Sequence, residues 1–551
     1  MKRDILKMLA IFSLVFVMYL PSLSSEFIVD DHVMIKDNPA IRSASPLWLF
    51  GQTFLPPVQT ALPPPYYRPI SVLWLWLGFH IWGLDAFMFR LFNIFFYFAI
   101  IIAVFSLSRR FFTDKNIAFL ATAVFALHPT HIESVAFICG ITDLSAGLFF
   151  ILAMLAFDSY KSFSRLVLAP ILFALALFSK ETAAAGIFIF PLYLYLVKGE
   201  NWKKSITKSL HLLIPFVLYF ALRYWVLFTF GSYTPIWYDF FKHIAMLPYL
   251  FVRYVQNLVI PLSLSPYHGE MYSYHSLLWW LMWIIPMLAI IIPSILWIRS
   301  KKVWFAILWV IILLFPALGI MQHRGAIWAE RFIFVPSFGM SIIFGYAYME
   351  LKEKIKLEKI RLIEILTFSY IIALFLIGIT YSVYFRSDWL WFGRVIHDSP
   401  RSAMGYCGIA EQFKDINQLD SAYYYTRLAL EQDSTSAWVF ASASNIALRM
   451  GKYDDVLKYS KKLRETDPNF PTGYIAPAIV YFERGDTLLA IQYADSAANV
   501  GKFDPWICLK VGKIFIQLGD TAKALENFNR ASQLLPDNEK IHMIIMQYLR
   551  K

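Results

Sequence analysis

The sequence is poor in charged residues and in cysteine. Only 16% of its 551 residues are Asp, Glu, Lys or Arg, whereas 58% are hydrophobic, and a soluble domain normally carries about 25% charged residues. The three cysteines lie far apart without metal-binding spacing, so neither a disulfide framework nor a zinc site is predicted. The net charge of +12 is spread over short clusters. Because no long basic patch forms, nucleic acid is excluded as a predicted partner.

Long hydrophobic runs are present instead. A membrane-spanning helix needs about 20 predominantly apolar residues, and the residue content of 18% Phe, Trp and Tyr also suits spans and headgroup-level positions. We therefore predict an all-α, polytopic membrane domain over residues 1–385. Its eleven predicted spans cover approximately residues 5–23, 87–108, 116–130, 141–157, 164–179, 182–197, 209–229, 276–297, 303–321, 332–350 and 362–383.

The basic residues between the spans predict the orientation. If the first loop, residues 24–86, lies on the outer face, every strong basic cluster between spans falls on the cytoplasmic side, as the positive-inside rule requires. An odd number of spans then places the C-terminal part on the outer face. Segments 69–84 and 241–262 are predicted to lie at the surface or to re-enter the membrane. The N-terminus has the pattern of either a cleaved secretory signal or an uncleaved first span, and the uncleaved span is favoured because no clear small-x-small site precedes Glu26.

A repeat with a period of 34 residues follows the last predicted span. Gly451, Gly485 and Gly519 lie 34 residues apart, and Asn417 holds the same position one period earlier. This period is typical of tetratricopeptide repeats, in which small residues let paired helices pack closely and each pair covers the next. An irregular helical bundle is the alternative. The predicted C-terminal part comprises a linker, residues 386–401, and an α-solenoid, residues 402–551, of about four repeats and a capping helix.

Two adjacent carboxylates, Asp30 and Asp31, follow the first span directly. Charged groups close to a membrane are costly to desolvate, so such a pair is either solvated in a loop or has a function there. The same loop carries a stiff aromatic and basic segment, Pro63 to Pro69, which contains Arg68. We therefore predict a functional site on the outer face around this acidic pair.

More polar residues lie at the predicted outer ends of other spans. His128, His131 and Glu133 resemble half of a metal site, but no further ligands with zinc spacing are evident. A polar cluster that binds substrate or orients a catalytic carboxylate is therefore favoured over zinc, and Asp143 is expected to join it.

Cations occur at the same predicted face. Lys180, in the turn with Glu181, is expected either to form an ion pair or to bind substrate. For Arg331 and Arg223, binding of a phosphate competes with a role as an anchor at the headgroup level.

Short motifs follow one another along the membrane part, namely Val29 to His32, Asp37 to Pro39, Tyr67 to Ile70, Trp82 to Leu84, His128 to Val135, Asp143-Leu144, Lys180-Glu181, Arg223, Phe315-Pro316, Ala329 to Phe332 and Pro336 to Gly339. No single motif is decisive. The ordered series, followed by the repeats, resembles the transmembrane and tetratricopeptide-repeat O-mannosyltransferases. The resemblance implies a GT-C glycosyltransferase domain, a multispanning fold that uses polyprenyl-phosphate sugars at the outer or lumenal face.

The resemblance also implies a reaction. A sugar, mannose by family analogy, would move from the polyprenyl phosphate to a hydroxyl of a protein or glycan acceptor, with inversion. A carboxylate must take the hydroxyl proton, and either Asp31, which we favour, or Asp30 would do so. The other carboxylate would orient a partner or, as in metal-dependent relatives, bind a divalent cation such as Mg²⁺ or Mn²⁺. No cofactor is certain.

The leaving phosphate gains negative charge in the transition state, so cations must converge on it. Arg331 is the first candidate, because Glu330 and Arg331 precede a span on its outer side. The predicted donor-binding residues are Arg331, Arg68, Arg324, His323 and Arg223, and the predicted pocket residues are His128, His131, Glu133, Asp143, Lys180, Glu181 and Glu330.

Other interpretations stay open. A GT-C enzyme could modify an envelope lipid or glycan, or a non-catalytic membrane scaffold could recruit protein partners through the repeats, which in the enzyme would hold the acceptor or a partner. A transporter is disfavoured, because the ionisable residues lie at span ends and not near the midplane. Short loops and few cysteines favour a bacterial inner membrane with a periplasmic site, although the lumenal face of an endoplasmic-reticulum membrane fits the same topology.

Overall fold

The structure is a computed structural model that describes residues 2–24, 26–42, 45–51, 53–54, 66–229, 240–269, 300–318, 328–354 and 357–549. Within these ranges every regular element is a helix, which confirms the predicted all-α class. The predicted span 276–297 and the candidates His323 and Arg324 lie outside the described residues.

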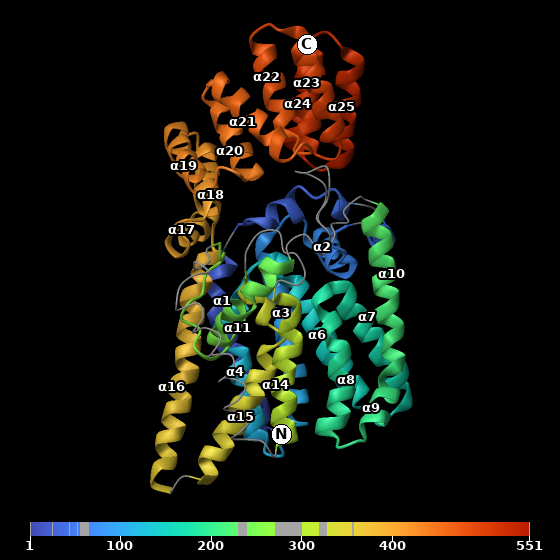
Figure 1. The fold of residues 1–551 in the computed structure, drawn as a ribbon, viewed down its shortest axis with the longest axis vertical. Coiled ribbons are helices and arrows are strands. Elements are labelled where there is room, and N and C mark those ends of the chain that lie inside the picture. Colours follow the sequence, from blue (N-terminus) through green and yellow to red (C-terminus); the bar gives the residue numbers. More distant parts are fainter. Residues whose placement is uncertain are drawn as a thin grey trace.

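The membrane part is a bundle of apolar helices (Figure 1). In the described ranges, five segments are long and apolar enough to cross a membrane, while the number of eleven spans stays a prediction. The five segments are α1 (Lys2–Leu23), α3 (Ala86–Ser108), Ile138–Phe157 with α6 (Ile141–Phe157), Trp202–Phe228 with α9 (Trp202–Ser209) and α10 (Leu213–Thr229), and Ile360–Phe385 with most of α16 (Leu357–Ser382).

Shorter helices complete the bundle. Gly339 lets two of them, α14 and α15, approach closely, because a Cβ at this position would lie 2.6 Å from the carbonyl oxygen of Ala306. Segments 69–84 and 241–262, predicted to lie at the membrane surface or to re-enter it, are largely helical, as α2 and α11. The bounds are α2 (Pro69–Trp82), α4 (Lys115–Ala126), α7 (Ala169–Ser179), α8 (Ile189–Leu192), α11 (Phe240–Val259), α14 (Lys301–Leu314) and α15 (Ser337–Lys354).

The basic loops gather at the end of the bundle where α1 begins. Lys7 of α1 bonds to Asn116 at the start of α4 over 2.5 Å, and Lys302 of α14 donates to the Phe111 carbonyl over 3.1 Å. The first loop and α2 lie at the opposite end, next to the C-terminal array (Figure 1). The predicted separation of basic clusters from the first loop is therefore present, whereas the membrane face that each end occupies stays a prediction.

The C-terminal array consists of four helix pairs and a final helix, as the 34-residue period predicted. The turn inside each pair contains a residue with positive φ, namely Asn417 (60°), Gly451 (69°), Gly485 (77°) and Gly519 (85°), a conformation that favours Gly and Asn. The pairs are α18 (Ala403–Asp415) with α19 (Leu419–Gln432), α20 (Ala437–Arg449) with α21 (Tyr453–Thr466), α22 (Thr472–Glu483) with α23 (Thr487–Val500), and α24 (Pro505–Gln517) with α25 (Thr521–Leu534), followed by α26 (Glu539–Leu549).

The segment predicted as a linker forms a helix, α17 (Asp388–Asp398), for most of its length. Ser387 caps its N-terminus by accepting a hydrogen bond from the Leu390 amide over 3.4 Å. α17 packs against the first repeat helix, α18. The array is thus joined to the bundle through a packed helix.

Candidate active site

Asp31 is completely buried at the base of the first loop. Its Oδ2 lies 3.7 Å from Nη2 of Arg90 on α3, and its Oδ1 accepts a hydrogen bond from the Cys139 amide over 3.2 Å. Burial raises the pKa of Asp31 to about 6, although Arg90 acts to lower it. This carboxylate therefore ties the loop to two helices of the bundle and has no access to a substrate in this arrangement.

Asp30, the adjacent residue, is exposed. Within the described part of the chain its carboxylate has no hydrogen bond or ion pair, yet Arg331 is close enough to lower its pKa. Loss of water raises that pKa more strongly, so the net change is upward. Together these observations indicate a carboxylate that is open to small molecules but surrounded by protein, opposite a cation.

Arg331 lies on the short 3-10 helix η11 (Glu330–Ile333). Its Nη1 donates to Oε1 of Glu133, and its backbone amide donates to Oε2 of the same carboxylate over 2.9 Å. Burial alone would lower the pKa of Arg331, but nearby carboxylates raise it overall. These carboxylates are, in order of effect, Glu133, Asp143 and Asp30. Arg331 is thus the cation around which three of the predicted acidic residues meet.

Two further buried ion pairs adjoin this centre. Arg68 binds Glu181 through two parallel hydrogen bonds of 2.8 and 2.5 Å, and Lys180 binds Asp143 over 2.6 Å. Arg223, on α10, is near enough to act electrostatically on Glu181. The bidentate pair uses both oxygens of Glu181 and one edge of the Arg68 guanidinium. Arg68 therefore has fewer hydrogen-bond donors left for a ligand than Arg331, whose side chain makes one such bond to a described residue.

Glu330 bonds to the segment that follows α11. Its Oε1 accepts hydrogen bonds from Nε2 of His268 over 2.7 Å and from the Ser265 amide over 3.1 Å. The ring of His268 stacks on Trp328 with 3.5 Å between ring centres. The predicted pocket residue Glu330 thus holds the segment that follows α11 against the start of η11.

The two predicted histidines are buried beneath the centre and bonded at both ring nitrogens. His131 contacts the Tyr97 hydroxyl over 2.7 Å and the Ser337 hydroxyl over 2.8 Å, and His128 contacts the Thr130 hydroxyl and the Leu258 carbonyl. Their neighbour Glu133 is the part of the motif that reaches Arg331. Within the described ranges, no three side chains of His, Cys, Asp or Glu converge as a metal site.

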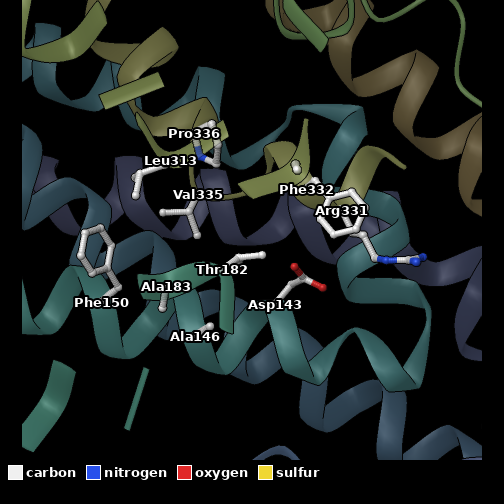
Figure 2. A pocket seen from close by; sticks show the side chains of 11 residues that line it. Asp143, Ala146, Phe150, Thr182, Ala183, Leu313, Arg331, Phe332, Val335 and Pro336 are labelled. Carbon is white, nitrogen blue, oxygen red and sulfur yellow. The ribbon is translucent and has the colours of Figure 1, made fainter. Parts of the chain in front are cut away.

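A cavity of about 30 Å³ begins beside this centre and extends into the bundle. Figure 2 shows Asp143 and Arg331 toward one end of it and Phe150 toward the other, with Thr182 and Val335 between them. At this size it has room for water and not for a sugar. It therefore marks a gap beside the charged cluster without itself being a substrate pocket.

Sequence reasoning missed two residues that position the acidic pair. Arg90, the partner of Asp31, lies inside a predicted span, and an ionisable residue inside a span is itself a signal of function or of a buried pair. Asp388 accepts a hydrogen bond from the Val29 amide over 2.9 Å and pairs with His32 over 2.9 Å. The Ser-Asp dipeptide after the last span is a helix-start signal, but nothing in it names a partner 359 positions away.

The chain is similar to several curated proteins. Protein O-mannosyl-transferase TMTC3 of Mus musculus is 25% identical over 409 residues, which cover 64% of this chain and 43% of that protein. TMTC3 of Homo sapiens is 21% identical over an alignment that covers 95% of this chain and 67% of that protein. Protein O-mannosyl-transferase TMTC2 of Homo sapiens is 33% identical over 26% of this chain and 18% of that protein. The chain thus spans less than half the length of the first of these relatives.

Among solved structures, a thermophilic TPR protein of Thermus thermophilus matches 33% of this chain and 95% of its own, with 13% identity and a TM-score of 0.28. MamA matches 29% of this chain and 94% of its own, with 14% identity and a TM-score of 0.24. No protein-family model matches the chain. The curated homologues confirm the resemblance to the transmembrane and tetratricopeptide-repeat O-mannosyltransferases that the ordered motifs predicted.

Proposed function

We propose that the chain is an integral-membrane glycosyltransferase that moves a sugar from a polyprenyl phosphate to a hydroxyl of a protein or glycan acceptor. Mannose is the proposed sugar, because the curated relatives are named O-mannosyl-transferases. The observation that supports the proposal is an exposed carboxylate without a described partner, Asp30, that is close enough to the cation Arg331 for the two charges to interact, at the loop end of an apolar bundle.

Asp30 is the proposed general base, and not Asp31, which the sequence alone favours. A base must reach the acceptor hydroxyl, and Asp31 is enclosed between Arg90 and the Cys139 amide. Asp30 is exposed, and its raised pKa makes its ionised form a stronger proton acceptor. Asp31 then serves to hold the loop.

Arg331 is the proposed ligand of the donor phosphate. Glu133 is hydrogen bonded to its Nη1, which leaves Nε and Nη2 for phosphate oxygens, and the side chain is 34% exposed. A guanidinium that Glu133 already orients would stabilise charge on the leaving phosphate without reorganisation. Arg68 is a weaker candidate, because Glu181 binds it through two hydrogen bonds.

The test uses the full chain in detergent or vesicles with radiolabelled polyprenyl-phosphate mannose and a hydroxyl-bearing acceptor peptide. Asp30→Asn is expected to lower the transfer rate by at least about 100-fold, the usual minimum for loss of a general base. Glu26→Gln is the matched control, since Glu26 is an exposed carboxylate in the same loop. Equal transfer by the two variants would refute the assignment of Asp30.

Two additions define the substrates. Replacing the peptide by a glycolipid acceptor distinguishes protein glycosylation from modification of an envelope lipid, and a glucose-bearing donor tests the choice of mannose. Addition of EDTA tests whether Mg²⁺ or Mn²⁺ takes part. Wild-type protein that transfers no sugar to any acceptor, although it is folded and binds a partner through its repeats, would favour the scaffold interpretation.

A further inference from the structure

The backbone on either side of Asp30 is held by one carboxylate from the C-terminal part of the chain. Oδ1 of Asp388 accepts the Val29 amide hydrogen bond over 2.9 Å, and Oδ2 contacts Nε2 of His32 over 2.9 Å. Val29 precedes Asp30 directly, and His32 follows it by two positions. Both carboxylate oxygens of Asp388, whose side chain is 11% exposed, therefore contact the turn that carries Asp30.

This turn has a backbone conformation that needs support. Val29 has a φ of 47°, which is unfavourable for any residue with a Cβ and especially for a β-branched one. Residues in such conformations persist only where their surroundings enforce them, and they concentrate at functional sites. The Val29 amide is the group that Asp388 binds, so the contact acts directly on the strained residue.

Asp388 is itself rigidly placed. It is the first residue of α17, whose N-terminus Ser387 caps. α17 packs on α18 of the first repeat, where Gly405 and Gly408 face its side chains, and Trp389 contacts Phe413 with 4.8 Å between ring centres. The position of the carboxylate therefore follows the position of the repeat array.

The array itself contacts the same loop at its C-terminal end. Nε1 of Trp506, on α24, donates to Oδ1 of Asp37 over 3.2 Å, and Arg42 pairs with Asp537 over 2.5 Å. These contacts join the loop to the last repeat, whereas Asp388 joins it to α17, which packs on the first repeat. The loop is thus connected to α17, to the last repeat and, through Asp31, to the bundle.

We propose that Asp388 is a positioning residue for transfer: it holds the Val29 to His32 turn so that the array presents the Asp30 carboxylate toward Arg331. This inference rests on the proposed function, in which Asp30 is the base. Asp388 touches no substrate in this account and acts only through the turn.

The test compares three variants of the full chain. Asp388→Ala removes both contacts. Asp388→Asn keeps an oxygen for the Val29 amide and can donate its NH₂ to a neutral His32, so it is the conservative rescue. Ser387→Ala is the matched control, because it weakens the same helix start without touching the loop.

Transfer kinetics and amide hydrogen exchange of residues 26–42 are measured for each variant. Asp388→Ala is expected to lower kcat by about 100-fold, the loss typical of a group misplaced by about 1 Å, with an unchanged KM for the polyprenyl-phosphate donor and faster exchange in the loop. Asp388→Asn is expected to stay within about 10-fold of wild type on the same scale, and Ser387→Ala to match wild type in both measurements.

The outcomes separate the inference from the proposed function. If Asp388→Ala and Ser387→Ala give the same kcat and the same loop exchange while wild type transfers sugar, the inference is overturned and the proposed function stands. If wild type transfers no sugar, and Asp388→Ala is the one variant with faster amide exchange in the loop, the role of Asp388 in holding the turn is supported and the proposed function is refuted. A fall in kcat for Asp388→Ala that Asp388→Asn restores supports both.

Discussion

The carboxylate of Asp31 lies 3.7 Å from the guanidinium of Arg90, and neither side chain is exposed to solvent. Arg90 also donates to the carbonyl oxygens of Ala136 and Glu26 over 3.1 and 2.6 Å. One side chain of α3 therefore joins the start of the first loop to the segment before α6. This arrangement keeps the base of the loop in place while Asp30 remains exposed.

Replacing Arg90 should destabilise the protein in a pH-dependent way. Arg90→Met leaves a buried carboxylate without its cation, which typically costs about 3–5 kcal/mol of the free energy of unfolding. Because the pKa of Asp31 is raised to about 6, Asp31 is mostly ionised at about pH 7.5 and mostly protonated at about pH 5. We expect the loss to be larger at the higher pH. Unfolding measured at both values, with the exposed Arg3→Met as control, checks this, and equal losses would contradict it.

The same residue predicts the sign of the wild-type pH dependence. The raised pKa means that folded protein binds the Asp31 proton more tightly than unfolded protein, in which the pKa is near its ordinary value of 3.8. The stability from this group is therefore complete below about pH 4 and is lost as the pH rises through about 6. Arg90→Met should raise the Asp31 pKa further and move this loss to higher pH.

The transfer rate should have an acid limb that reports Asp30. A general base acts in its ionised form, so kcat/KM should rise with pH through the pKa of Asp30. This pKa lies above its ordinary 3.8, because the surrounding protein displaces water from the carboxylate and this raises the pKa more than Arg331 lowers it. Arg331→Gln removes the lowering effect and should shift the acid limb to higher pH. Profiles of both proteins, with Glu26→Gln expected to follow wild type, give the measurement. If the acid limb of Arg331→Gln lies at the same pH as that of wild type, Arg331 does not lower the pKa of Asp30 and the prediction is wrong.

Removing Arg42 should destabilise the protein more than removing its ion-pair partner Asp537. Asp537 is 37% exposed, so Asp537→Ala should cost at most about 1 kcal/mol and less at high salt. The Arg42 side chain is almost buried and also donates to the carbonyls of Ile35, Asn38 and Lys36. Arg42→Ala should therefore cost roughly 3 kcal/mol more than Asp537→Ala, about 1 for each of the three lost bonds to carbonyls. Chemical unfolding of both variants tests the difference, and equal losses would be contrary to it.

The packing of α17 on α18 predicts opposite effects at two glycines. A Cβ at Gly408 would lie 2.1 Å from the Phe392 ring, whereas a Cβ at Gly393 would meet nothing within 4 Å. Gly408→Ala should therefore destabilise the protein by about 1–3 kcal/mol, while Gly393→Ala should stabilise it by up to about 1 kcal/mol through helix propensity. Thermal unfolding distinguishes them, and similar midpoints would argue against this packing.

The helices of the repeat array could be predicted because the pattern that indicates them is a spacing along the chain. The 34-residue period located every turn inside the helix pairs, including the one at Asn417, where φ is positive as it is at the three glycines. Helix positions in the array follow directly from such spacing. The helix α17 was not predicted, because the segment 386–401 between a span and a repeat looks like a connection unless the Ser387 cap is recognised.

The sequence predicted which polar residues gather at the site, but not which of them pair with one another. Polar residues at span ends must gather at one end of a bundle, and Arg331, Glu133, Asp143, Lys180, Glu181 and Arg68 do so. Their pairing, Arg68 with Glu181 and Lys180 with Asp143, has no counterpart in sequence spacing. It depends on the rotation and height of each helix, which side-chain packing across the bundle determines.

The chain by itself therefore determined the helical class, the repeat array and the set of polar residues at the loop end of the bundle, because span length, period and charge placement are properties of consecutive residues. Only the tertiary structure decided which of two adjacent aspartates is enclosed. Asp30 and Asp31 have the same chemistry, but Asp31 is buried against Arg90 of α3, whereas Asp30 is exposed and under the electrostatic influence of Arg331. Such a difference arises from charges brought together across hundreds of residues, which no local pattern contains.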